Sequence, residues 1–195
     1  MNFDVFNISH NAEPPAKGRG LVSVPFISDG FFHKTVIYIV EHSQDQTVGF
    51  ILNQPLPMSL HEIVEDVPES DFPIHIGGPI DHSRLHMLHT IGSDIPGSVL
   101  VSSGIYWGGD FEYVKRLIQT NKITTNQIRF FLGYSGWGNN QLQQEILEDT
   151  WIITSIFQQD IFSLDTQNVL WNHVLQRMGD KYKAWTHFPP NPLYN

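Results

Sequence analysis

Histidine, carboxylate and serine side chains are the groups in this chain that could perform acid–base or nucleophilic chemistry, because the chain has no cysteine. His42 follows an apolar, β-branched run, His89 lies near the end of an alternating run, and Glu145 falls within a helical pattern. Two of these groups beside each other in a cleft would suit a general acid and base. Ser135 is a poor nucleophile candidate, because its GYSG context departs from the G-x-S-x-G pattern. The sequence therefore assigns no catalytic residue, and an enzyme using His42, His89 or Glu145 stays open as an alternative.

Three histidines, His82, His86 and His89, are close enough in sequence to suggest a metal site. Residues 84–90 alternate as a strand, however, and side chains three apart on a strand face opposite sides. Beyond Asp81, the segment offers no acidic ligand at a spacing typical of zinc sites. We therefore predict surface or half-buried histidines and no metal or other cofactor.

The stretch 130–146 is the most distinctive in the chain and combines a strand, glycines and a helix pattern. Its strand is apolar on both faces, and Asn139 or Asn140 is placed to cap the helix, with Gln143 completing a capping box. A turn through residues 133–141 would leave backbone N–H groups near the helix start, where a small anion can bind. The candidate ligand-binding residues of this stretch are Tyr134, Trp137 and Gln141.

Further candidate ligand-binding residues lie at strand ends and glycine turns. His42 and Asn53 each close a predicted strand, and open sheets place binding sites at such ends. Gly77 and Gly78 form a doublet that matches no phosphate-binding pattern, and His89, near the end of its alternating run, is a further candidate. The alternative is that His42 and Asn53 satisfy loop backbone groups and that the glycines only turn the chain.

Periodicity and turn residues predict the helices and strands that position these residues. Seven or eight strands and three or four helices, without regular alternation, predict a mixed α/β or α+β sheet. No linker or repeat divides residues 1–195, so a single domain is expected, with an extended arm over 1–17 and a proline-rich tail over 187–195. The strands are expected at 20–26, 35–41, 47–53, 74–76, 84–90, 99–102, 128–132 and 151–155; the helices begin near Ser59, Asp110, Asn140 and Asp165, and a glycine-aromatic turn covers 104–109.

Composition narrows the class of protein. The net charge is −9, and the eleven Lys and Arg residues form no basic stripe of the kind that nucleic-acid-binding proteins carry. Direct nucleic-acid binding is therefore not expected. The N-terminus has no signal-peptide pattern, and no apolar run approaches the roughly 18 residues that span a bilayer. We expect a cytoplasmic protein without a membrane segment.

The order of these motifs over nearly the whole chain resembles the AlgH/YqgE family of uncharacterised bacterial proteins. The matching residues are Gly18-Arg19-Gly20-Leu21, Pro25-Phe26, Asp29, Phe32, Thr35-Val36, Glu41-His42, Gly49, Asn53, Pro55, Gly77-Gly78-Pro79, Leu88-His89, Tyr106 to Asp110, Phe131 to Trp137, Gln141-Leu142, Glu145 and Trp151.

This resemblance implies an α+β domain whose mixed, bifurcated sheet folds into a pseudo-barrel flanked by three or four helices. It associates the chain with control of transcription and supplies no catalytic residue. The chain departs from the family pattern at Lys34, at Asn139-Asn140 and at Gln143. We therefore expect a non-catalytic regulatory or binding protein whose partner is another protein or a small anionic ligand, with any effect on transcription being indirect.

Overall fold

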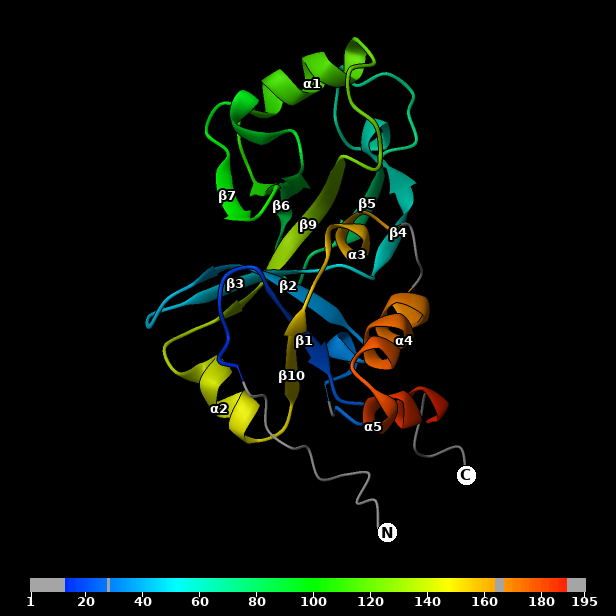
Figure 1. The fold of residues 1–195 in the computed structure, drawn as a ribbon. Coiled ribbons are helices and arrows are strands. Elements are labelled where there is room, and N and C mark those ends of the chain that lie inside the picture. Colours follow the sequence, from blue (N-terminus) through cyan, green and yellow to red (C-terminus); the bar gives the residue numbers. More distant parts are fainter. Residues whose placement is uncertain (1–12, 28, 164–166, 189–195) are drawn as a thin grey trace, which may run out of the picture.

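The computed structural model describes residues 13–27, 29–163 and 167–188, and its sheet is organised around strand β9 (Ile128–Trp137) (Figure 1). Both faces of β9 are covered: Phe131 packs into one hydrophobic cluster and Phe130 into another. This explains why the strand is apolar on both faces, as its sequence predicted. Arg129, 2% exposed, donates from Nη1 to the carbonyl of Leu52 at 2.9 Å.

In the described part of the chain, ten strands form the sheet, in the order β10-β1-β2-β3-β9-β6-β8-β7, with β4 and β5 branching from β9. Only β5 pairs with β9 in parallel; the other pairings are antiparallel. The strands are β1 (Arg19–Ser23), β2 (Val36–His42), β3 (Thr47–Ile51), β4 (Pro55–Ser59), β5 (Pro73–Ile76), β6 (Ile80–His89), β7 (Val99–Ser102), β8 (Ile105–Trp107), β9 and β10 (Trp151–Ser155).

The sheet divides at Gly133, where β9 exchanges one neighbour for another. Residues 130–132 pair with β5, whereas residues 135–137 pair with β3. Gly133 has φ +68°, a conformation that glycine adopts without steric cost, and an added Cβ would lie 2.6 Å from the carbonyl oxygen of Ile80. The bifurcated sheet expected from the family resemblance is confirmed, and it curls into a half-barrel. A hydrogen bond of 2.8 Å between Tyr38 Oη on β2 and Ser102 Oγ on β7 links two distant strands.

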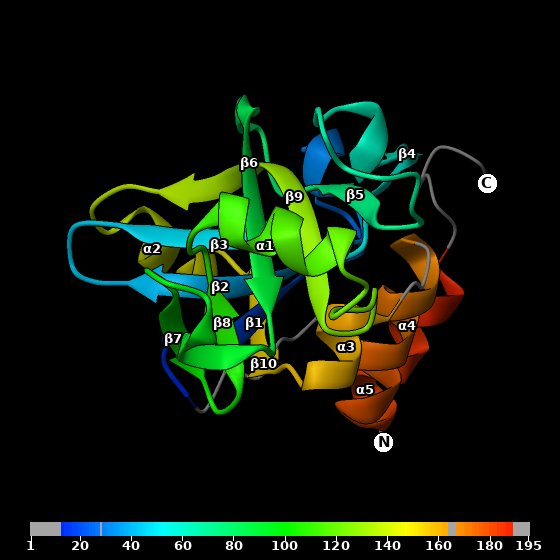
Figure 2. The same cartoon turned by 90° about the horizontal axis from the view of Figure 1, so that it is seen from above.

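Helices pack against this sheet, and the start of α1 follows local capping. The carboxylate of Asp110 accepts a hydrogen bond from Tyr113 N at 3.1 Å, and Val114 and Ile118 bury one face of the helix that follows. Figures 1 and 2 show two helices grouped on the side away from the β2–β3 hairpin. The helices are α1 (Phe111–Gln119), α2 (Gln141–Leu147), α3 (Gln158–Phe162), α4 (Gln167–Arg177) and α5 (Asp180–Lys183), with α4 and α5 forming the group; short 3-10 turns span Gly30–Phe32, Leu60–Glu62, Gly92–Asp94 and Ala184–His187.

Three hydrophobic clusters hold these layers together. The first contains Trp171 of α4 and lies against β1, β2 and β3, and the second contains Phe130 and lies under α1. The third packs Leu142 and Ile146 of α2 against β1, β2 and β3 together with Trp151. Because α2 belongs to the third cluster, its position relative to Trp137 and Trp151 is fixed by packing.

Several local expectations need correction. Residues 104–109 were expected to form a turn only, but Ile105–Trp107 forms β8, because it finds partners in both β6 and β7. The expected turn over 133–141 begins only at Gly138, because β9 continues through Trp137. The short helices α3 and α5 were not predicted. Gly179, with φ +112°, follows the end of α4 as expected.

Three of the predictions fall wholly or partly on residues that the structure does not describe. These are the helix cap at Asp165, most of the arm over 1–17 and most of the tail over 187–195. Within residues 13–27, 29–163 and 167–188, no helix has the length and apolar character needed to cross a membrane.

Candidate functional site

The connection from β9 to α2 places an indole and a carboxylate beside each other. Trp137 ends β9, and Gln141 begins α2 three residues after Gly138. The Gln141 side-chain oxygen accepts a hydrogen bond from Gly138 N at 3.1 Å and closes the connection. Asn140 precedes the helix as expected but adopts a left-handed conformation, with φ 57°, and its side chain makes no capping bond. The predicted capping by an asparagine side chain is therefore wrong.

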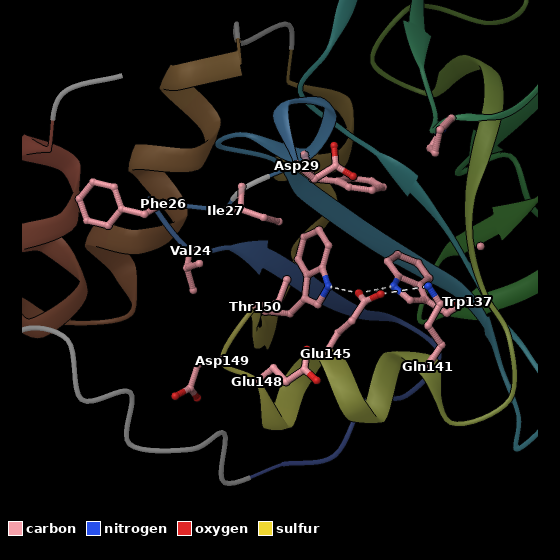
Figure 3. A pocket seen from close by; sticks show the side chains of 14 residues that line it. Val24, Phe26, Ile27, Asp29, Trp137, Gln141, Glu145, Glu148, Asp149 and Thr150 are labelled. Atoms are coloured by element: carbon pink, nitrogen blue, oxygen red, sulfur yellow. Dashed lines mark hydrogen bonds between the residues drawn. The ribbon is translucent and has the colours of Figure 1, made fainter. Parts of the chain in front are cut away.

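The carboxylate of Glu145 is held by three side-chain donors (Figure 3). Its Oε2 accepts from Trp137 Nε1 at 2.8 Å and from Trp151 Nε1 at 2.7 Å, and its Oε1 accepts from Gln141 Nε2 at 3.0 Å. The two indole rings stand edge to face, with centroids 5.9 Å apart. Charge-assisted hydrogen bonds to a carboxylate are stronger than neutral ones, so this arrangement fixes both rings and the carboxylate.

A cavity of about 530 Å³ opens beside this carboxylate, between α2, the end of β9 and the segment after β1 (Figure 3). We call it the α2 cavity. Its wall includes four aromatic side chains and four carboxylates, with Glu145 on α2 and Glu148 at the residue that follows the helix. The lining residues are Val24, Phe26, Ile27, Asp29, Phe32, Pro79, Gly136, Trp137, Gln141, Glu145, Glu148, Asp149, Thr150 and Trp151.

Two of the predicted ligand-binding residues, Trp137 and Gln141, line the α2 cavity. Tyr134 lines a second cavity of about 410 Å³, whose wall also includes His86 and Trp107. Gly136 and Trp137 contribute to both cavities, so the two adjoin at the end of β9. Burial lowers the pKa of His86, which packs among Phe50, Trp107 and Tyr134.

The sheet brings His42 to the start of α2 but places His89 elsewhere. His42 lines a third cavity, of about 330 Å³, together with Gly138, Asn140 and Gln143, and its Nδ1 lies 2.7 Å from Thr47 Oγ1. His89 is fully buried near Gly108, whose carbonyl oxygen lies 3.1 Å from His89 Nε2. Burial lowers the pKa of His89 and favours a neutral ring.

The remaining predicted site residues support the fold. Asn53 is fully buried; its Oδ1 accepts from Val36 N, and its Nδ2 donates to the carbonyl of Lys34, both at 2.9 Å. Gly77 and Gly78 pass so close to β9 that an added Cβ would lie 2.3 Å from Gly133 O and 2.1 Å from Tyr134 C, respectively. These contacts match the structural alternative that the sequence left open for Asn53 and the glycine doublet.

The three acid–base candidates are each paired with other groups. Glu145 binds two indoles and Gln141, His42 contacts Thr47, and His89 contacts Gly108. A serine also lies 3.2 Å from His89 Nε2, but this residue, Ser98, donates its proton to the Ile95 carbonyl at 2.7 Å. Across the described ranges, no group of three or more histidine, aspartate or glutamate side chains is arranged to hold a metal ion.

Sequence reasoning assigned no binding role to most of the α2 cavity. Asp29, Phe32 and Trp151 belong to the motifs that carry the family resemblance, but their types and spacing did not connect them. The pairing of β1 with β10 connects them: Val24 N donates to Thr150 O at 3.2 Å, just beyond the two strands. In the sequence, only the recurrence of aromatic and acidic residues among the family motifs could have indicated that these residues line one cavity.

Comparison with known proteins identifies the family. An AlgH-like family model matches residues 20–183. A UPF0301 protein of Bacteroides fragilis is 39% identical over 196 residues, covering 100% of this chain and 99% of the relative. A UPF0301 protein of Cytophaga hutchinsonii is 34% identical and covers 92% of this chain and 98% of that protein.

Two solved structures share the fold. Protein DIP2367 from Corynebacterium diphtheriae superposes with a TM-score of 0.76 at 23% identity, over 96% of this chain and all of that one. The AlgH protein from Pseudomonas aeruginosa gives a TM-score of 0.73 at 23% identity, over 92% and 97% of the two chains. The matched family model and the full-length relatives together show that this chain belongs to the AlgH-like family.

Proposed function

We propose that this protein is a non-catalytic binding protein that acts in regulation through a ligand or partner group held in the α2 cavity. The observation that supports this proposal is that hydrogen bonds hold the carboxylate of Glu145 in the cavity wall. Its two oxygens already accept three hydrogen bonds, two of them from indoles that are 4% and 1% exposed. A carboxylate that holds two buried rings in position has a structural role. A general base must instead exchange protons with a substrate.

The size and lining of the α2 cavity also suit binding. Its volume of about 530 Å³ lies within the range of small-molecule sites, and such sites combine aromatic walls with a few placed polar groups. The earlier expectation of a small anionic ligand stays a prediction. The four carboxylates of the α2 cavity disfavour an anion there, because like charges repel.

The overall charge favours regulation through a ligand or a protein partner over direct contact with DNA. The protein carries −9, and most DNA affinity arises from lysine and arginine side chains that neutralise phosphates. Any influence on transcription would then pass through whatever the protein binds.

A small-molecule screen that also determines whether each compound is chemically changed tests the proposal. The protein is incubated with a metabolite library, melting temperatures are recorded, and compounds that stabilise it are recovered and analysed by mass spectrometry. We expect stabilising compounds to be recovered unchanged. Their effect should be lost in Thr150→Phe, which narrows the α2 cavity while leaving the backbone hydrogen bonds of residue 150 in place.

Conversion of a stabilising compound to product, abolished by His42→Ala or Glu145→Gln, would instead establish the enzyme hypothesis. A library without any stabilising compound, or stabilisation unchanged in Thr150→Phe, would contradict the α2 cavity as the binding site. Circular dichroism of each variant shows whether it has folded.

A further inference from the structure

The α2 cavity has a one-sided charge. Four of its fourteen lining residues are acidic, namely Asp29, Glu145, Glu148 and Asp149, and none of the fourteen is lysine, arginine or histidine. The hydrogen bonds to Glu145 come from two neutral indoles and a neutral amide, so they orient its charge without cancelling it. The cavity therefore presents a negative potential to whatever enters it.

The aromatic wall of the same cavity is packed into a fixed arrangement. Phe32 and Trp151 meet edge to face with centroids 5.4 Å apart, and Trp151 meets Trp137 in the same way at 5.9 Å. Phe26, at the other end, is 41% exposed, and its ring is tilted by 54° against that of Phe188, with centroids 5.1 Å apart. Because the two indoles are 4% and 1% exposed, the apolar surface open to a ligand comes mainly from the less buried side chains Phe26, Ile27 and Phe32.

Apolar side chains and carboxylates in one cavity select a particular chemistry. We propose that the α2 cavity binds an organic cation, an ammonium or guanidinium group carried on a short apolar stem. The inference rests on the proposed binding function and specifies the class of ligand. The stem packs against the apolar side chains of the cavity, and the charged end lies near the exposed carboxylate of Glu148.

A bare metal ion fits this cavity less well than an organic cation. Hard divalent cations need six or more oxygen ligands at about 2.0–2.6 Å, held close around one point. Within the described part of the chain, no three acidic or histidine side chains converge in this way. Apolar aromatic surface beside the carboxylates offers nothing to a bare ion but stabilises a hydrocarbon stem.

The same cationic group could arrive on a free amine or on a basic side chain of a protein, and two probes separate these sources. Agmatine represents the free amine, and a blocked Ala-Arg-Ala tripeptide represents a protein side chain. The blocked Ala-citrulline-Ala tripeptide is the matched neutral probe, because it keeps the shape of arginine and lacks its charge. Each probe is titrated into the full-length ¹⁵N-labelled protein, and the indole N–H resonances of its five tryptophans are followed.

We expect agmatine or the arginine peptide to shift the Trp137 and Trp151 indole resonances, with the citrulline peptide binding at least about tenfold more weakly. Glu148→Gln should weaken the cation about threefold, the ratio expected for one charge about 6 Å away at the dielectric constant of water. The matched control is Glu69→Gln, an equal change of charge at an exposed residue that does not line the α2 cavity. It should leave the affinity unchanged.

Equal binding of the citrulline and arginine peptides, or equal loss of affinity in both variants, would overturn the cation inference. The absence of any shift at Trp137 and Trp151 with either cation at millimolar concentration would overturn it as well. A neutral or anionic compound that shifts these resonances while both cations fail would reject the cation and leave the binding proposal intact. Turnover of a bound compound would reject the binding proposal itself.

Discussion

Trp137 and Trp151 donate their indole N–H groups to one oxygen of the same carboxylate, that of Glu145, although they lie on different strands. Both rings are nearly fully buried, so neither indole can turn to water if the carboxylate is lost. This relationship couples α2 to the end of β9 and to the start of β10.

Replacing Glu145 with alanine should therefore destabilise the protein. Each buried donor left without an acceptor costs about 1–3 kcal/mol. Urea unfolding at pH 7 measures the change in free energy, and Glu148→Gln, at the exposed residue just after α2, serves as the control, with an expected change within about 0.5 kcal/mol. Equal stability of Glu145→Ala and the control would show that the two indole bonds contribute little.

The free energy of unfolding should fall as pH decreases from about 6.5. Burial first, and the positive charge of Arg129 second, lower the pKa of His75 to about 3, although a backbone hydrogen bond at Pro73 opposes the shift. The unfolded chain binds a proton at this histidine near pH 6.5, whereas the folded chain stays neutral down to about pH 3. The stability that His75 contributes is therefore complete above pH 6.5 and is lost progressively below it.

Urea unfolding between pH 5 and 7 measures this dependence. His75→Asn cannot titrate there, so its stability should change with pH less steeply than the wild type, by up to about 1.4 kcal/mol per pH unit. Identical slopes for the two proteins would contradict the lowered pKa of His75.

The glycines of the central sheet should differ sharply in their tolerance of substitution. A Cβ on Gly78 would lie 2.1 Å from Tyr134 C, and backbone cannot move aside. A Cβ on Gly136 would meet the end of the Ile80 side chain at 3.0 Å and the ring of Tyr134 at 3.2 Å, and the Ile80 side chain can shift. We expect Gly78→Ala to prevent folding or lower the melting temperature strongly, and Gly136→Ala to cost less than about 1.5 kcal/mol.

Gly136→Val, with two further methyl groups, should cost about 1–3 kcal/mol. Melting temperatures of the three variants decide the matter. Similar values for Gly78→Ala and Gly136→Ala would show that the contact between the glycine doublet and β9 is looser than the described distances.

Any effect of this protein on transcription should be indirect. We expect no sequence-selective mobility shift of genomic fragments at submicromolar protein and about 150 mM salt, an ionic strength at which only substantial phosphate contact survives. A selective shift under these conditions would mean that the fold gathers dispersed lysines and arginines into a binding surface.

The predictable parts of the fold are those that depend on local pattern. Phe130 and Phe131 showed a strand buried on both faces, and Asp110 marked the start of α1. Ile105–Trp107 was missed because its strand character comes from partners on β6 and β7, which local sequence does not reveal. Asn140 was misjudged because it adopts a left-handed backbone conformation, with φ 57°, and its side chain makes no capping bond.

The candidate site was predictable only where it coincides with one continuous stretch. Trp137 and Gln141 were found because both belong to the β9–α2 connection. Phe26 and Asp149 come together only through the pairing of β1 with β10, whose residues lie far apart in the sequence. Their joint role depends on strand register, which a single sequence specifies weakly.

The central position of β9 also has a consequence for how the chain is made. During synthesis, β1 to β8 leave the ribosome before the strand that joins β3, β5 and β6 exists. Until residue 137 has emerged, the edges of three strands are open, and β1 still lacks β10. Such long-range pairing is slow, and exposed strand edges attract other chains. The sheet therefore cannot be completed until the last third of the chain has been synthesised. The yield of folded protein in the cell should depend on chaperones that shield the unfinished sheet.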